Sequence, residues 1–163
     1  MRLIRHGESE ANIRWLWGGD APLTDKGRRQ AEELPKTETS LVVASGLLRA
    51  KQTARIVYPD HELMVDNTFD EIHMGRFENH SMMDDEEMWR LYFSEPYLMH
   101  LYSGGDDVQR RAEMALERLN GYPTDTVIFT HNTLMRAMMS VMEYGSVKYM
   151  NDIKVPNCGI WEV

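Results

Sequence analysis

The chain has 163 residues, of which 42% are hydrophobic and 27% charged, a composition typical of a folded domain. Eighteen lysines and arginines against 26 aspartates and glutamates give a net charge of −8, which argues against a broad basic face for DNA or RNA. No apolar stretch is long enough to cross a bilayer, so neither a nucleic-acid nor a membrane partner is expected. Cys158 is the only cysteine, which excludes an internal disulfide and favours a reducing, cytoplasmic setting.

Short apolar runs alternate with amphipathic segments along most of the chain. Strands are expected around residues 3–4, 40–44, 63–65, 126–130 and 159–163, and helices at 25–34, 47–58, 107–119 and 134–142. Thr24 is placed to cap the first helix, and the helix at 47–58 is expected to bury Leu48, Thr53, Ile56 and Val57. The alternation predicts an α/β fold, a three-layer αβα sandwich with a mostly parallel sheet.

One stretch departs from this alternation. Residues 77–102 carry no clear strand and are rich in methionine, aromatic and acidic residues. We expect a cap insertion at about 77–105 that lies over one end of the sheet, with a helix near 85–93. No linker or internal repeat is present, so residues 1–163 are expected to form a single domain.

Polar side chains follow three of the predicted strands. Arg5 and His6 end the first strand, Arg49 begins the helix after the second, and His131 ends the strand at 126–130. Ligands bind at the carboxyl ends of strands in such sheets, where the connecting loops converge. Guanidinium groups bind phosphate oxygens, and imidazoles act as nucleophiles or hydrogen-bond donors. The set therefore favours phosphoryl transfer in which arginines supply the positive charge.

Five motifs in the chain are specific enough to compare with a protein family. They are Arg5-His6-Gly7-Glu8 followed by Asn12, Leu23-Thr24-x-x-Gly27-x-x-Gln30-Ala31, Ser45-x-Leu47-x-Arg49-Ala50-x-Gln52-Thr53-Ala54, Asp70-Glu71-x-x-x-Gly75-x-Phe77-Glu78 and Val127-Ile128-Phe129-Thr130-His131. The sequence resembles the histidine phosphatase superfamily, which includes cofactor-dependent phosphoglycerate mutases and many small phosphatases. The matching blocks extend from residue 2 to about residue 138.

The resemblance implies a set of roles for the matching residues. His6 would be the nucleophile that becomes phosphohistidine, and Glu71 would protonate the leaving oxygen and then activate water. The phosphoryl oxygens would be held by Arg5, Arg49 and His131, with help from Asn12 and from the backbone of Asn132. Asp70 and Glu78 are close rivals for the role of Glu71. Two residues depart from the pattern, because Asn132 and Asn79 stand where most relatives have glycine.

The leading prediction is a metal-independent phosphomonoesterase that hydrolyses a small phosphorylated metabolite through phospho-His6, without a cofactor. Between residues 77 and 109, Arg90 is the one basic residue against eight acidic ones, a balance that would repel a bisphosphate and so disfavours a mutase. The alternatives are mutase-type phosphoryl transfer, a phosphoprotein phosphatase and a catalytically silent domain that binds phosphorylated ligands. A homodimer is compatible with the sequence.

Overall fold

A five-stranded sheet forms the centre of the protein, whose computed structural model describes residues 1–163. The strands are β1 (Arg2–Arg5), β2 (Val42–Ala44), β3 (Leu63–Val65), β4 (Val127–Thr130) and β5 (Ile160–Glu162), arranged in the order β3-β2-β4-β1-β5. The first four in this order are parallel, and β5 runs antiparallel to β1 at the edge. The predicted mostly parallel sheet is therefore confirmed, including the buried central strand at β4 and the edge strand at the C-terminus.

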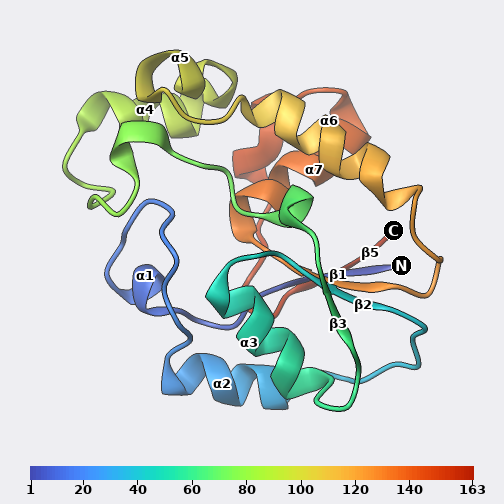
Figure 1. Cartoon of the computed structure of the whole chain (residues 1–163). Helices are drawn as coiled ribbons and strands as arrows, with labels where there is room; N and C mark the ends of the chain where they lie inside the picture. The colour runs from blue at the N-terminus through green and yellow to red at the C-terminus, as the bar shows by residue number, and fades with distance from the viewer.

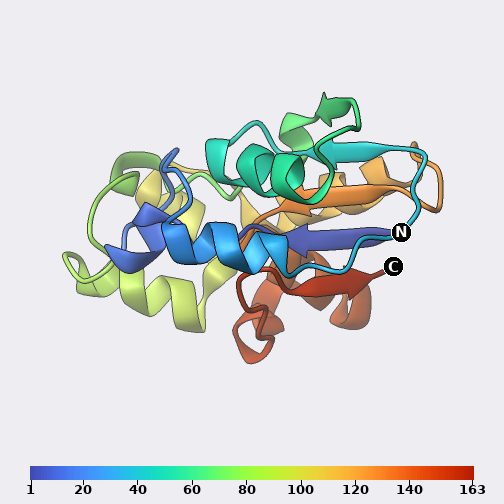
Figure 2. The same cartoon turned by 90° about the horizontal axis from the view of Figure 1, so that it is seen from below.

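Helices cover both faces of this sheet (Figures 1 and 2). The helices α2 (Asp25–Glu32) and α3 (Leu48–Val57) lie on one face, and α6 (Val108–Leu119) and α7 (Asn132–Tyr144) on the other. Alternate strand residues point to opposite faces. Leu3, Val43 and Ile128 accordingly pack among the residues of α6 and α7, whereas neighbours such as Ile4 and Phe129 pack against α2 and α3. The predicted three-layer sandwich is thus observed.

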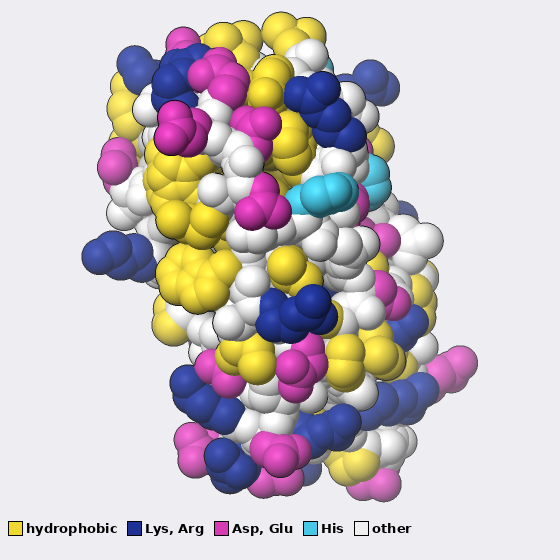
Figure 3. All heavy atoms as spheres, turned by 90° about the vertical axis from the view of Figure 1, so that its left-hand side faces the viewer, with side chains coloured by type: hydrophobic (Ala, Val, Ile, Leu, Met, Phe, Trp, Pro, Cys, Tyr) yellow, Lys and Arg dark blue, Asp and Glu magenta, His cyan; other side chains and the backbone are white.

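A cap lies beyond the carboxyl ends of the parallel strands (Figures 1 and 2). It consists of residues 77–105 and contains α4 (Glu86–Ser94), a short 3₁₀ turn (Pro96–Leu98) and α5 (Met99–Ser103). The short helix α1 (Glu10–Ile13) follows β1 at the same end of the molecule. Figure 3 views this end, where hydrophobic side chains gather over the upper half among acidic ones. The expected cap helix is present, while α5 is an element that its short apolar sequence did not indicate.

Most helix boundaries follow from their capping residues. The Thr24 hydroxyl accepts the Gly27 N–H and begins α2, and the Asp107 carboxylate accepts the Arg110 N–H and begins α6. Three further 3₁₀ turns lie at Asn67–Phe69, Gly75–Phe77 and Val147–Asp152. No helix is both long and apolar enough to span a lipid bilayer.

The buried face of α3 differs from the prediction. Its buried residues are Arg49, Ala50, Thr53, Ala54 and Val57, a stripe with helical spacing. Leu48 and Ile56 lie beside this stripe; Leu48 is 37% exposed and Ile56 half-buried. The prediction was wrong for Leu48, because the stripe runs through Arg49, a residue type that a hydrophobicity pattern assigns to solvent. Thr53 and Val57 are buried as predicted, and Ile56 packs against the core as a partly buried residue.

Candidate active site

His6, Arg49 and His131 meet at the carboxyl ends of β1, β2 and β4. Each has at most 3% of its surface exposed. Arg49 Nε donates to His6 Nε2 over 3.0 Å, and the rings of His6 and His131 have their centroids 5.1 Å apart. Three segments that are distant in sequence therefore bring two imidazoles and a guanidinium together within the protein.

The His6 ring is held at both nitrogens. Nδ1 lies 2.6 Å from the Gly7 carbonyl oxygen, while Nε2 faces Arg49. Burial lowers the pKa of His6 well below 6.5, and the charges of Arg49 and Arg5 lower it further. The ring is consequently neutral at pH 7. Because Nδ1 donates to the carbonyl, Nε2 carries the lone pair, and this is the form of imidazole that acts as a nucleophile.

The two guanidinium groups beside His6 lack acidic partners. Arg5 Nη1 donates to the Val155 carbonyl over 2.6 Å, and Arg49 Nη1 donates to the Gly19 carbonyl. Neither group forms an ion pair with a carboxylate, and Arg5 Nε is buried without a partner. Burial lowers the pKa of both arginines, although guanidinium groups remain charged in proteins. The site thus holds positive charge that an anion can neutralise.

A cavity of about 90 Å³ opens at this point. Its polar and charged lining consists of Arg5, His6, Asn12, Arg49, Glu71, Asn132 and Thr133, with the aromatic rings of Trp17 and Tyr92 beside them. His131 is not part of this lining, and its ring lies beside that of His6, with the two centroids 5.1 Å apart. We refer to this space as the first cavity.

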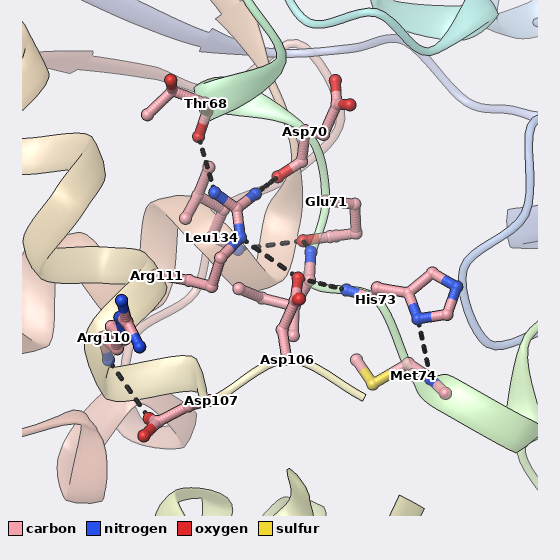
Figure 4. A network of polar contacts seen from close by, with 12 residues as sticks. Thr68, Asp70, Glu71, His73, Met74, Asp106, Asp107, Arg110, Arg111 and Leu134 are labelled. Carbon is pink, nitrogen blue, oxygen red and sulfur yellow. Dashed lines mark hydrogen bonds and ion pairs between the residues drawn. The ribbon is translucent and has the colours of Figure 1, made fainter. Parts of the chain in front are cut away.

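The three carboxylates that the sequence left as candidate acids point in different directions. Glu71 accepts N–H bonds from Ile72, Thr133 and Leu134, each over 3.0 Å, and so lies at the N-terminus of α7 (Figure 4). Asp70 points away from it (Figure 4) and accepts from Ser45 and the Gly46 N–H.

Glu78 accepts the N–H groups of Gly19 and Met74, over 2.6 and 2.7 Å. It thereby ties the loop after α1 to the cap. Of the three candidates, only Glu71 lines the first cavity together with His6.

A second cavity of about 450 Å³ adjoins the first, and Gly18 and Glu71 line both. It is strongly acidic, with the carboxylates of Asp20, Asp70, Glu71, Glu78 and Asp106 in its lining. Its single cation, Arg111, is bound to Asp106 and to two backbone carbonyls. No group of three or more His, Cys, Asp or Glu side chains is arranged to hold a metal ion.

The asparagines that depart from or extend the motifs have distinct environments. Asn12 Oδ1 accepts from the Ser9 N–H and from Asn157 Nδ2, over 3.1 and 3.2 Å, which fixes its side chain at the wall of the first cavity. Asn132 is the first residue of α7 and lies in the same wall. Asn79 has φ of 63°, a left-handed backbone that asparagine adopts more readily than most residues. Its substitution for glycine therefore preserves the turn.

Two polar residues that line the first cavity, Tyr92 and Thr133, were not found from the sequence. Tyr92, from the cap helix α4, is 4% exposed and lines the first cavity. Its hydroxyl accepts from Arg136 Nη1 over 3.1 Å and lies 3.3 Å from Thr133 Oγ1. Neither residue belongs to a spaced motif, and nothing in the aromatic-rich cap indicates which ring faces the cavity.

Comparisons with known proteins place the chain in a family. The model of the histidine phosphatase superfamily (branch 1) matches residues 1–163. The chain belongs to this superfamily. The family predicted from the motifs is therefore confirmed.

Individual members of the superfamily show how the resemblance is distributed. A probable phosphoglycerate mutase of Enterobacter is 37% identical over 99 residues, which cover 54% of this chain and 46% of the mutase. The adenosylcobalamin/alpha-ribazole phosphatase of Escherichia coli is 46% identical over 69 residues, or 39% of this chain and 34% of that enzyme.

Among solved structures, the Bacillus stearothermophilus protein YhfR superposes with a TM-score of 0.82 at 26% identity, covering 98% of this chain and 87% of that one. The matches to these two curated relatives thus cover less than half of their length, whereas the structural match covers nearly the whole chain.

Proposed function

We propose that this histidine phosphatase hydrolyses a small phosphate monoester through a phosphohistidine formed on His6. The observation that carries the proposal is the state of His6, a neutral ring whose Nε2 lone pair lies in a cavity bordered by two guanidinium groups without acidic partners. Such a group attacks phosphorus, and the guanidinium groups stabilise the charge on the phosphoryl oxygens. The resemblance to a curated phosphatase supports the same activity.

In the first step, the His6 Nε2 lone pair attacks phosphorus as the bond to the leaving oxygen breaks. Arg49 now donates to Nε2, so its guanidinium must turn toward a phosphoryl oxygen when the substrate enters. Arg5 Nε and the backbone and side chain of Asn132 are further donors beside the cavity. In the second step, water attacks phospho-His6 and releases inorganic phosphate. The arginines supply the positive charge, so the reaction is proposed to need no metal or cofactor.

Glu71 is proposed to be the acid and base. It lines the cavity that contains His6, and three N–H groups hold its carboxylate in place. It would give a proton to the leaving oxygen and take one from the attacking water. Asp70 and Glu78 line only the second cavity, which favours Glu71 over both.

The second cavity favours a substrate with one anionic group. It continues from Glu71, where the leaving group departs, and its lining contains five carboxylates against one arginine. That arginine is already bound by Asp106. A mutase must bind a second anionic group of its substrate, and no free cation is available there. The charge balance therefore supports the hydrolase over mutase-type transfer.

The remaining alternatives are also less well supported. A first cavity of about 90 Å³ beneath a cap favours a small metabolite over a phosphoprotein. The neutral nucleophile and the adjacent carboxylate favour an enzyme over a silent binding domain. The cytoplasmic location expected from the single cysteine remains a prediction.

The test is a panel of phosphate monoesters that includes sugar phosphates, phosphoglycerates, nucleotides and an aryl phosphate, each assayed with and without EDTA. We expect hydrolysis that EDTA does not abolish, with no activity in His6→Ala and acid-labile, base-stable phosphate trapped on His6. Arg49→Ala should weaken phosphate binding and rate together. Phosphate trapped on Ser9 or Ser45, or a requirement for Mg²⁺ or Zn²⁺, would contradict the proposal.

A further inference from the structure

A chain of hydrogen bonds leads from Asp70 to His131 behind the first cavity. The Ser45 hydroxyl donates to Asp70 Oδ1 over 2.7 Å, and His131 Nε2 lies 2.7 Å from Ser45 Oγ. Ser45 and His131 are both fully buried. The Leu47 N–H also donates to Ser45 Oγ, over 3.1 Å. No step of the proposed reaction has yet used Asp70 or Ser45.

The direction of each bond in this chain follows from counting protons. Asp70 Oδ1 accepts the Gly46 N–H over 2.7 Å and therefore acts as an acceptor toward Ser45 as well. A serine hydroxyl has one proton and two lone pairs. Its proton goes to Asp70, and one lone pair accepts from Leu47. The second lone pair faces His131. The Nε2 atom of His131 must therefore carry a proton and donate it to Ser45 Oγ.

This arrangement determines the state of the other ring nitrogen. His131 Nδ1 is buried and has no hydrogen-bond partner. Burial lowers the pKa of His131 well below 6.5, and the neighbouring positive charges lower it further. The ring is therefore neutral, with an unused lone pair on Nδ1. A phosphoryl oxygen that approached this lone pair would be repelled rather than bound.

We propose that Asp70 is a positioning residue which, through Ser45, keeps the proton of neutral His131 on Nε2, so that an oxyanion binds beside Nδ1 only together with one proton. The proton comes from solvent, or from the monoanionic form of the ester, which then binds as the dianion. The inference rests on the proposed function only in taking the first cavity as the oxyanion site.

The charges around His131 explain why Asp70 matters to this step. The titratable groups that act on the ring from the surrounding elements are Arg5 at the end of β1, His6 after it, Arg49 on α3 and Arg111 on α6. Asp70 reaches the ring through Ser45. Three of these groups are positively charged arginines, whereas His6 is neutral. Protonated His131 therefore depends on the bound oxyanion and on the carboxylate of Asp70, which polarises Ser45 toward the ring.

The test uses sulfate, a dianion whose own protonation state does not change near neutral pH. Because sulfate binds without being hydrolysed, its binding can be measured independently of phosphatase activity. Nitrogen NMR of the histidine rings reports which nitrogens carry protons, and His131→Asn assigns the signal. In wild type without sulfate we expect a proton on Nε2 alone. With sulfate bound we expect protons on both nitrogens, and an affinity that falls about tenfold per pH unit above neutrality.

Asp70→Asn and Asp20→Asn form a matched pair, because each removes one charge from the lining of the second cavity. Asp20 accepts from the Leu48 N–H and has no contact with Ser45. Loss of a negative charge near an anion site ordinarily strengthens anion binding, and Asp20→Asn should do so slightly. Asp70→Asn should instead weaken sulfate binding roughly tenfold, a shift of one pKa unit, at both pH 8 and pH 5.5, because the free ring is neutral at both.

Whether Asp70→Asn weakens or strengthens sulfate binding therefore tests the role proposed for Asp70. Sulfate binding in Asp70→Asn that equals or exceeds that of wild type would overturn the proposal. The wild-type measurement is decisive even if the variant fails to fold. A proton already on Nδ1 in the free protein, or a ring that stays neutral with sulfate bound, would each contradict it. Failure of the phosphatase assays with a positive NMR result would reject the proposed function alone.

Discussion

His6 and His131 lie side by side and hold their protons on opposite ring nitrogens. The carbonyl of Gly7 accepts from Nδ1 of His6, whereas Ser45 accepts from Nε2 of His131. Two rings of the same residue type are thus given different chemistry by single hydrogen bonds. The lone pair on His6 Nε2 serves attack on phosphorus, and Nδ1 of His131 becomes a donor only when it gains a proton.

The role proposed for Glu71 can be separated into its acid and base parts. An alkoxide leaving group needs a proton, whereas an aryl oxide leaves readily without one. Glu71→Gln should therefore slow cleavage of alkyl phosphates by about 10²–10⁴ while largely sparing phosphorylation of His6 by an aryl phosphate. Because water activation also fails, rapid-quench assays with the aryl substrate should show a burst and accumulation of phosphoenzyme.

The control for this prediction is Glu78→Gln, which alters a carboxylate of the second cavity that binds backbone N–H groups. It should show no burst with the aryl substrate. If Glu71→Gln slowed phosphorylation equally for both substrates, the assignment of Glu71 would be wrong. Asp70 and Glu78 would then be the next acids to examine.

The hydroxyl of Tyr92 is oriented by Arg136. Because Arg136 Nη1 donates to Tyr92 Oη, the hydroxyl proton is free to point to Thr133 or to an oxygen in the cavity. Tyr92→Phe should weaken inhibition by inorganic phosphate on the order of tenfold, as expected for one hydrogen bond to a charged group. Tyr102→Phe is the matched control, since that hydroxyl donates to Asp85 elsewhere in the cap. Equal inhibition constants in the two variants would remove Tyr92 from the binding site.

At the scale of elements, Arg111 of α6 holds the segment that carries Asp70 and Glu71 (Figure 4). Its guanidinium donates to the carbonyls of Thr68 and Asp70 over 3.2 and 3.0 Å, and to Asp106 over 3.1 Å. Asp106 in turn accepts the His73 N–H. The backbone on both sides of Glu71 is thereby fixed to the helix.

Arg111→Ala should therefore displace Glu71 and also destabilise the fold. Two carbonyls lose their donor, which should lower the free energy of unfolding by about 1–3 kcal/mol. The rate with alkyl phosphates should fall more than the rate with aryl phosphates, because Glu71 loses its position. Urea unfolding and the two assays measure these effects. Arg110→Ala, at an exposed neighbouring position, should change neither quantity; similar losses in both variants would indicate a general effect on α6.

The elements of the fold were largely predictable because each has a local signal. Continuous apolar runs marked β2 and β4, the capping residue Thr24 marked the start of α2, and apolar residues at helical spacing marked α6. The buried face of α3 was not predictable from hydrophobicity, since Arg49 is buried by its contact with His6. Burial of a charged residue depends on partners from other parts of the chain, which a pattern within one helix does not contain.

The candidate active site was likewise predictable only in part. His6, Arg49 and His131 could be brought together in advance because parallel strands end at one edge of the sheet. The choice of Glu71 over Asp70 could not be made from spacing, because adjacent residues in an extended segment point in opposite directions and either could face the cavity. Tyr92 depends on how the cap folds back, and the cap has no regular pattern.

At the scale of the whole molecule, two fully buried neutral histidines couple the fold to pH. The pKa values of His6 and His131 are held well below 6.5, chiefly by burial. In the unfolded chain both rings bind protons as the pH falls through about 6.5, whereas in the folded protein they stay neutral. The unfolded state then binds more protons, so folding stability is complete above this pH and decreases below it.

We therefore expect the free energy of unfolding to fall by about 1.4 kcal/mol per buried histidine for each pH unit below 6.5. Urea unfolding between pH 7.5 and pH 5 tests this, in a window above the range where most carboxylates titrate. Replacing one of the two rings by a group that does not titrate, as in His131→Asn, should reduce the slope by about half. His61→Gln, at an exposed histidine, should leave the slope unchanged. A free energy that stays constant across this window would show that the two rings can be protonated within the fold, and the neutral nucleophile proposed for His6 would then need to be abandoned.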